Sequence, residues 1–357
     1  MKVLITLAAL GVVSATRGDA QSLTAQLTGE VHHAVVTGDT RVGPNVGINN
    51  PLYLPPATDA NYSGVVNIWM RNAAGAVYGA CTGSLLNNRN ILTAAHCVST
   101  GTNAITPTSF TARFRNADGS FTEVNGTGFR VQQNYSGAVL EEQDVAVLTL
   151  GTDAPASARR YSLFAGSPLV DYTMAGFGRT GTGLTGDNNT ANNQFSAINV
   201  LRAGRNRFES TGRDGGSFAT SVNPAPGSFG GILISDFDVE GESAAASFVC
   251  AGLGFCNAGI TLETSIGRGD SGGAAFTNTW QVLGVASWGS GSGGNLSQFG
   301  TVFGYACVAN FAANARCLEN YNFVQASLIP EPSTYLLMAT GLMGVVAIAR
   351  RRRTNNN

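Results

Sequence analysis

The most informative segment of the sequence is Gly269-Asp270-Ser271-Gly272-Gly273, in which a serine is flanked by residues that permit a sharp turn. Glycines at these positions let a substrate group approach the main chain closely. Taken alone, Gly-x-Ser-x-Gly also describes the nucleophile elbow of α/β-hydrolases. That fold places its histidine after the serine, and no histidine follows Ser271 in this chain. The α/β-hydrolase alternative is therefore excluded.

A base that activates this serine must be one of three histidines, His32, His33 or His96. The first two lie in a polar stretch close to the expected N-terminus of the mature chain. His96 is the only histidine within the expected folded body, where small residues surround it and Cys97 follows it directly. An isolated histidine usually has no chemical role, but here a serine and an acid are present in the right order. The sequence therefore predicts His96 as the general base.

A serine and a histidine of this kind act together with an acid that orients the imidazole and stabilises its protonated form. The sequence predicts Asp144 as this acid. It precedes the apolar run Val145–Leu150, which predicts a buried strand that holds the carboxylate rigidly. The other acids considered lie in turn-like or more polar settings and are expected to be solvated. They are Asp118, Glu123, Glu141, Glu142, Asp153 and Asp171.

With His96, Asp144 and Ser271 in this order, the chain resembles the trypsin/chymotrypsin family of serine endopeptidases. The resemblance spans about Tyr62 to Val324. Four segments carry it: Cys81–Leu85 with Leu92–Cys97, Gln143–Leu148, Gly267–Gly273, and Ser287–Gly289. A weaker fifth is Ala175–Gly178, where the family usually has tryptophan at the place of Phe177.

The resemblance implies an all-β fold of two packed six-stranded antiparallel barrels, over about 61–160 and 165–325, with the triad in the cleft between them. It further implies an oxyanion hole made by the N–H groups of Gly269 and Ser271. The backbone of Ser287-Trp288-Gly289 is expected to pair with an extended substrate. No metal or organic cofactor is required.

Two family features are altered in this sequence. Counting back from Ser271 places Ser265 at the base of the specificity pocket, and with Gly289 and Gly300 on its walls this uncharged pocket favours apolar side chains. Glu263 entering the pocket, and attracting a basic side chain, is the alternative. In relatives, a proteolytic cut frees an apolar N-terminus, which pairs with the aspartate that corresponds to Asp270. The usual motif for this activating cut is missing from the sequence. A bond from Asp270 to a side chain is therefore the alternative.

Composition supports the all-β expectation and limits the function. The chain has 46 glycines and 11 prolines, and the short apolar stretches between them are typical of many strands joined by turns. One modest helical pattern lies around 309–315, and loop insertions are expected between Gly178 and Gly231.

Lysine and arginine number 21 against 22 acids, and the only dense basic cluster, 350–353, adjoins an apolar run. Nucleic-acid binding is therefore excluded as the function.

The N-terminal residues have the pattern of an export signal. A charged start, an apolar run over 3–13 and then small residues predict a signal peptide over 1–20, with cleavage after Ala20 or alternatively Ala15. Residues 21–60 form an expected N-terminal extension, and the peptidase domain covers 61–325.

Export places the six cysteines in an oxidising compartment, where they pair rather than bind metal. A structural zinc site is disfavoured because the chain has no CxxC pair and only three histidines. Local spacings predict three disulfides: Cys81–Cys97, Cys250–Cys256 and Cys307–Cys317.

The C-terminal end has three parts: Pro330-Glu331-Pro332, an apolar run over 335–349, and four consecutive arginines over 350–353. This order resembles the PEP-CTERM sorting signal of Gram-negative bacteria, whose members are cut near the Pro-Glu-Pro motif by an exosortase. We therefore expect a sorting signal over 329–353, separate from the fold, with a transmembrane helix over 335–349. A membrane anchor that is never cleaved is the alternative.

Together these patterns predict an exported serine endopeptidase of the cell envelope or extracellular space, processed by signal peptidase and an exosortase. One alternative is a catalytically silent relative that binds peptides or matrix polymer. Another is a membrane-tethered structural protein with a protease-like fold. The three side chains together favour the enzyme, because a binding role gives no chemical reason to retain all of them.

Overall fold

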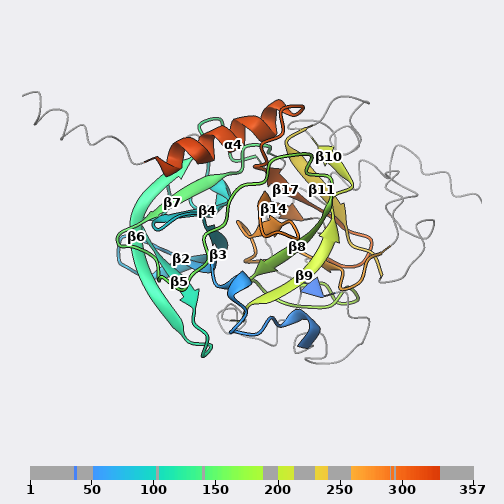
Figure 1. Ribbon diagram of the computed structural model, residues 1–357, viewed down its shortest axis with the longest axis horizontal. Coiled ribbons are helices and arrows are strands. Elements are labelled where there is room, and N and C mark those ends of the chain that lie inside the picture. Colours follow the sequence, from blue (N-terminus) through green and yellow to red (C-terminus); the bar gives the residue numbers. More distant parts are fainter. Residues whose placement is uncertain are drawn as a thin grey trace, which may run out of the picture.

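The computed structural model describes residues 36–37, 51–101, 104–138, 141–187, 200–212, 230–239, 259–289, 291–292 and 295–329. These residues form two β-sheet halves and one C-terminal α-helix, as Figure 1 shows. The expected signal peptide, most of the expected N-terminal extension and the sorting signal from residue 330 onward lie outside them.

The first half is a closed antiparallel barrel of six strands in the order β2-β3-β4-β7-β6-β5. Their bounds are β2 Val65–Arg71, β3 Val77–Leu85, β4 Asn90–Thr93, β5 Ser109–Arg115, β6 Phe121–Val131 and β7 Ala146–Leu150. Apolar side chains such as Ile68, Phe110 and Leu148 are fully buried in this half. Because a closed barrel leaves no unpaired edge, each strand is held on both sides.

The second half is an open sheet of seven strands in the order β10-β11-β17-β14-β13-β8-β9. Their bounds are β8 Asp171–Gly176, β9 Arg202–Arg207, β10 Ser210–Gly212, β11 Ile232–Asp236, β13 Ala274–Phe276, β14 Val282–Gly289 and β17 Val302–Cys307. Two short two-stranded sheets accompany it: β1 Val36–Thr37 with β12 Thr264–Ser265, and β15 Gly291–Ser292 with β16 Asn295–Leu296.

The expected closure of this half into a second six-stranded barrel is not found among the described residues. Strand β12 lies beside β9, where Arg205 bridges to Glu263 in parallel. The strand partner of β12 is β1 from the N-terminal extension, so β12 does not extend the seven-stranded ladder. The all-β class is thus confirmed, with one closed barrel and one curled open sheet.

One of the two buried apolar clusters extends across both halves. Val285 and Phe276 of the second half belong to the same buried cluster as Ile68 and Leu148 of the barrel. The ring of Tyr161, in the segment that connects the halves, lies 4.6 Å from the ring of Phe276 between centroids. The two halves therefore share apolar packing as well as hydrogen bonds.

The α-helix α4 spans Ala315–Leu328, so the sequence-based placement around 309–315 is wrong. The helix starts after Asn314, whose side chain accepts hydrogen bonds from the N–H groups of Arg316 and Cys317 at 3.1 Å each. Asparagine is a favourable N-cap because its side chain satisfies N–H groups that lack partners in the first turn. The preceding residues form turns, and the disulfide Cys307–Cys317 ties the start of α4 to β17.

Among the residues that the structure describes, no helix is long and apolar enough to cross a membrane. The expected transmembrane segment at 335–349 lies outside the described residues, as does the expected disulfide Cys250–Cys256.

Candidate active site

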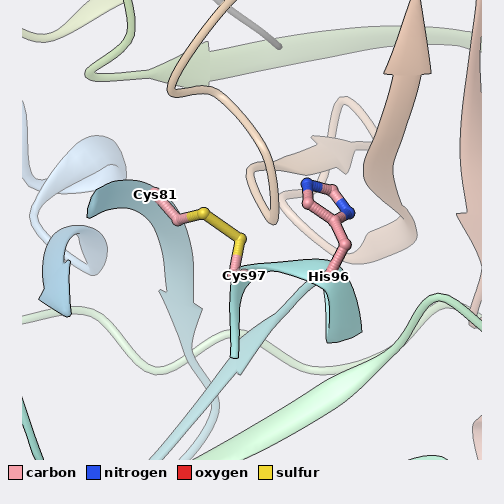
Figure 2. A group of neighbouring side chains, drawn as sticks. All are labelled: Cys81, His96 and Cys97. Atoms are coloured by element: carbon pink, nitrogen blue, oxygen red, sulfur yellow. A yellow bond between two sulfur atoms is a disulfide. The ribbon is translucent and has the colours of Figure 1, made fainter. Parts of the chain in front are cut away.

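His96 lies in a short 3-10 turn, η3 (Ala95–Cys97), that directly follows β4. The disulfide Cys81–Cys97 fixes this turn to β3, as Figure 2 shows. The two sulfurs and a His96 ring nitrogen lie within 4.8 Å of one another, which resembles a metal-ligand cluster. The sulfurs are bonded to each other and are not thiolates, so this group serves as a structural anchor beside the imidazole.

Asp144 directly precedes the buried segment that leads into β7, and its side chain faces His96. Its Oδ2 lies 2.6 Å from His96 Nδ1, and its Oδ1 accepts a hydrogen bond from the His96 backbone N–H at 2.8 Å. Ser287 of β14 donates its hydroxyl to Asp144 Oδ2 at 2.6 Å. Burial alone would raise the pKa of the Asp144 carboxyl, but the His96 charge and these hydrogen bonds together hold it below its ordinary value. Asp144 therefore stays ionised although it is buried.

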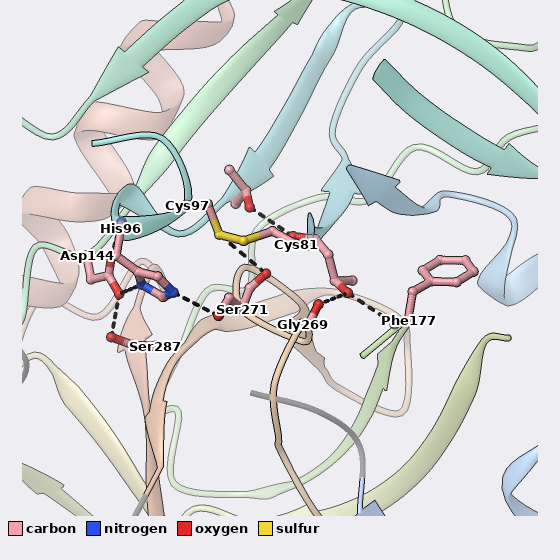
Figure 3. Close-up of a disulfide and its surroundings, with 10 residues drawn as sticks. Cys81, His96, Cys97, Asp144, Phe177, Gly269, Ser271 and Ser287 are labelled. Carbon is pink, nitrogen blue, oxygen red and sulfur yellow. Dashed lines mark hydrogen bonds and ion pairs between the residues drawn. A yellow bond between two sulfur atoms is a disulfide. The ribbon is translucent and has the colours of Figure 1, made fainter. Parts of the chain in front are cut away.

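Ser271 completes a continuous hydrogen-bonded line from the other half of the molecule. Its Oγ lies 2.8 Å from His96 Nε2, on the side of the ring opposite Asp144 (Figure 3). The backbone around it turns through two glycines with positive φ, Gly269 at 106° and Gly272 at 81°. A Cβ on Gly272 would collide with Thr93 Oγ1 and Thr82 O of the barrel, so only glycine fits at this contact. The structure thus brings together all three residues predicted as the triad.

The N–H groups of Gly269 and Ser271 donate to no acceptor in the part of the chain that the structure describes. The carbonyl that precedes Gly269, Arg268 O, accepts from Arg179 N at 2.7 Å. The carbonyl of Gly269 accepts from the Thr82 hydroxyl at 2.9 Å. Both peptides that flank Gly269 are therefore held in place while its N–H stays available.

Asp270 is buried beneath this loop and is held by the chain itself. Its Oδ1 accepts from Gly178 N at 3.0 Å, and its Oδ2 from Gly267 N at 3.4 Å. Arg202, which is 3% exposed, lies opposite Gly176 in the β8–β9 ladder, and a Cβ on Gly176 would collide with Asp270 Oδ1. Burial raises the pKa of Asp270, and the Arg202 charge and the Gly178 hydrogen bond oppose that rise. The hydrogen bonds that Asp270 accepts among the described residues come from backbone N–H groups, so a bond to a side chain stays a prediction.

The residues predicted to form the specificity pocket differ in exposure, because Ser265 is buried whereas Gly289 and Gly300 are half-buried. Ser265 is 1% exposed, and its strand β12 is paired with Val36 and Thr37 of the N-terminal extension. Gly289 faces Phe303 across the β14–β17 ladder. Gly300, by contrast, donates its N–H to Phe237 O in a turn outside that ladder, so the structure does not place it opposite Gly289.

Glu263 is bound to backbone groups of a neighbouring loop. Its carboxylate accepts from Asp238 N and Ile260 N at 2.7 Å each. Burial raises the pKa of Glu263 to about 8. These contacts occupy both carboxylate oxygens, which argues against the alternative that Glu263 recognises a basic substrate side chain.

Glu141 and Glu142 were expected to be solvated, and this expectation is wrong, because they are only 3% and 4% exposed. Glu141 accepts hydrogen bonds from backbone N–H groups of 136–138, which compensate for its burial. Glu142 accepts from Gly231 N and forms an ion pair with Arg316 of α4 at 3.4 Å. Both acids anchor the segment that leads to Asp144.

Asn320 of α4 strengthens the same anchor. Its side-chain amide donates to Glu142 O at 2.7 Å and to Cys307 O at 2.9 Å. The helix thus ties the Asp144 segment of the first half to β17 of the second. This role could not be predicted from local patterns, because Glu142 lies 178 positions from Asn320 along the chain.

Comparison with known families agrees with this geometry. The trypsin family model matches residues 58–227, which include His96 and Asp144 and end before Ser271. The model of the PEP-CTERM protein-sorting motif matches residues 328–353. No curated protein matches the chain. The chain therefore carries a trypsin-family domain followed by a PEP-CTERM sorting motif, and both resemblances inferred from the sequence are confirmed.

Two residues of this site were missed in the sequence. Arg202 lies in an expected loop insertion, and Thr82 lies in a segment that resembles the family without a role of its own. The one available signal for Thr82 is a polar side chain in a strand beside a disulfide cysteine, and that signal does not indicate a partner.

Proposed function

We propose that the chain is an exported serine endopeptidase that hydrolyses peptide bonds through an acyl-enzyme intermediate. The observation that carries this proposal is the hydrogen-bonded line from Asp144 through His96 to Ser271, assembled from both halves of the molecule. A trypsin-family domain supports a peptidase in general terms. The roles of the individual residues rest on this geometry and on chemistry.

In the proposed mechanism, Ser271 Oγ attacks the scissile carbonyl while His96 Nε2 takes its proton. The same imidazole then delivers the proton to the leaving amine, which leaves an acyl-enzyme. In the second half of the reaction His96 takes a proton from water, the water attacks the acyl carbonyl, and the proton returns to Ser271 Oγ as the acid product is released. Asp144 keeps the proton of the resting imidazole on Nδ1 and stabilises the imidazolium that forms. The oxyanion is bound by the N–H groups of Gly269 and Ser271, and each such donor contributes about 3 kcal/mol in the transition state.

Substrate binding is assigned to the end of β14. The buried Trp288 packs over Gly304, where a Cβ would collide with the indole. Gly289 carries no side chain, which leaves space beside Phe303 for a substrate side chain. Ser287 has its hydroxyl committed to Asp144, so its contribution to substrate is through the backbone. With Ser265 at the bottom of the proposed specificity pocket, the pocket is uncharged and favours apolar substrate side chains.

The proposed export and processing of the protein follow from the two ends of the chain. Signal peptidase removes residues 1–20, and the peptidase domain over 61–325 folds outside the cytoplasm. The PEP-CTERM motif indicates sorting to the envelope of a Gram-negative bacterium. Membrane contact through 335–349 precedes or replaces cleavage by an exosortase.

The test uses the purified full-length chain, a fluorophosphonate probe and a casein or peptide substrate. We expect Ser271→Ala to abolish labelling and His96→Ala to slow it, and each to lower kcat by at least about 10⁴-fold. Ser120→Ala is the matched control, because its hydroxyl bonds only within an exposed turn to Asp118 and Asn116. Circular dichroism verifies that each variant remains folded.

Two results would contradict the proposal. One is full turnover in Ser271→Ala or His96→Ala. The other is a wild-type chain that neither reacts with the probe nor hydrolyses any peptide, which would favour a catalytically silent binding protein.

A further inference from the structure

Thr82 is a fully buried residue of β3 whose polar atoms contact three other segments. Its N–H donates to Ser271 O at 2.8 Å, and its carbonyl accepts from Thr93 Oγ1 at 2.8 Å. Its hydroxyl donates to Gly269 O at 2.9 Å and accepts from Phe177 N at 3.1 Å. Dashed lines at the labelled residues Gly269 and Phe177 in Figure 3 mark these two hydrogen bonds.

The hydroxyl has one proton, and that proton is used on Gly269 O. Phe177 N–H fills its acceptor side, so the direction of the donated bond is fixed. Gly269 has no Cβ and lies at φ 106°, where its flanking peptides have few steric restraints. The Thr82 hydroxyl therefore supplies a restraint that glycine itself lacks.

The two flanking carbonyls are held by one neighbouring segment and one barrel strand. Arg179 N holds the carbonyl before Gly269, and Thr82 Oγ1 holds the carbonyl after it. With both carbonyls fixed, the Gly269 N–H has one orientation. A preoriented donor contributes to transition-state binding without reorganising during the reaction.

We propose that Thr82 is a positioning residue, whose hydroxyl keeps the Gly269 N–H aimed at the oxyanion. This inference rests on the proposed function. It assigns the closed barrel a second role, because the barrel then orients the oxyanion donor of the other half as well as supplying His96 and Asp144.

The test separates the effect of the Thr82 hydroxyl from that of the side-chain shape. Thr82→Val keeps the shape and removes the hydroxyl, whereas Thr82→Ser keeps the hydroxyl and removes the methyl. We expect Val to lower kcat by about 10- to 100-fold with KM changed less than about threefold, and Ser to retain most of kcat. Where Val does not fold, Thr82→Ala is compared with Thr82→Ser, because that pair also differs only in the hydroxyl.

A peptide aldehyde supplies a readout that a purely structural role would not change. Its tetrahedral adduct with Ser271 carries an oxygen in the oxyanion position, whereas the matching peptide amide binds without an adduct. We expect Thr82→Val to weaken aldehyde binding in proportion to kcat and to leave amide binding unchanged. Thr111→Val is the matched control, since Thr111 is also a buried barrel threonine with a bonded hydroxyl, to Asn125 Oδ1 at 2.7 Å.

The outcomes separate this inference from the proposed function. A wild-type chain that does not react with a fluorophosphonate overturns the proposed function and this inference with it. A reactive wild type, with Thr82→Val losing stability but keeping kcat and aldehyde affinity, overturns this inference alone. Loss of kcat in Thr82→Ser equal to that in Thr82→Val or Thr82→Ala also overturns it.

Discussion

The two halves of the molecule contribute to one site with sheets of different construction. The first half is a closed barrel, and it holds His96 and Asp144 on segments anchored by Cys81–Cys97 and by α4. The second half is an open sheet, and it presents Ser271 on a glycine-rich loop between β12 and β13. That loop is bonded to its own half through Gly272 N and Ala286 O at 2.9 Å, and to the barrel through Thr82 N and Ser271 O at 2.8 Å. The comparison indicates that the closed half serves as a template for the loop of the open half.

The contact at Gly272 is the most sensitive point of that template. Gly272→Ala places a Cβ against Thr93 Oγ1 and Thr82 O at a positive φ. We expect it to lower the free energy of unfolding by about 4 kcal/mol or more, through strain and overpacking combined. Urea denaturation measures this effect.

The matched control for that contact is Gly119→Ala. Gly119 has a similar φ of 85°, and a Cβ there meets nothing within 4 Å. We expect a loss of about 1 kcal/mol from backbone strain alone. Equal losses in the two variants would show that the contact between the halves has no special energetic weight.

The two disulfides differ in what they anchor, although their loops are similar in length. Cys81–Cys97 encloses a separation of 16 residues and Cys307–Cys317 one of 10, so replacing either pair by alanine should destabilise the fold by about 3 kcal/mol. We expect the first replacement also to lower kcat, because Cys97 adjoins His96, and the second to change kcat little. Thermal unfolding and peptide hydrolysis below the melting temperature measure the two effects. Unchanged kcat after loss of Cys81–Cys97 would contradict the template role of the barrel.

The buried carboxyl of Glu263 makes the open half sensitive to pH. Its pKa is raised to about 8, so the native state binds its proton more tightly than the unfolded state does. The free energy of unfolding should therefore fall as the pH rises from the ordinary range of a glutamate through 8. Glu263→Gln, which resembles the protonated acid, should remove on the order of 2 kcal/mol of this fall between pH 5 and 8. Urea midpoints across that range test it, and parallel pH curves for wild type and variant would contradict it.

Much of the fold and the candidate site was predictable because it depends on local patterns. Short apolar runs between turns predicted an all-β body, and Val145–Leu150 predicted the strand that becomes β7. The helix was misplaced because alanines around 309–315 outweighed the signal of Asn314, which caps the following segment. The sequence predicts Glu141 and Glu142 as solvated, because their backbone donors and Arg316 cannot be identified from neighbouring residues.

The chemical groups, their order along the chain and the families that they resemble can all be read from the amino-acid sequence. Three features follow only from how the sheets pack: the second sheet stays open within the described residues, Arg202 lies opposite Gly176 in the β8–β9 ladder, and Thr82 bonds to Gly269. These contacts join residues that are far apart in sequence, 187 positions in the last case. Local periodicity reports which face of a strand is buried, but a hydrogen bond between distant segments depends on how whole sheets pack, which no local pattern records.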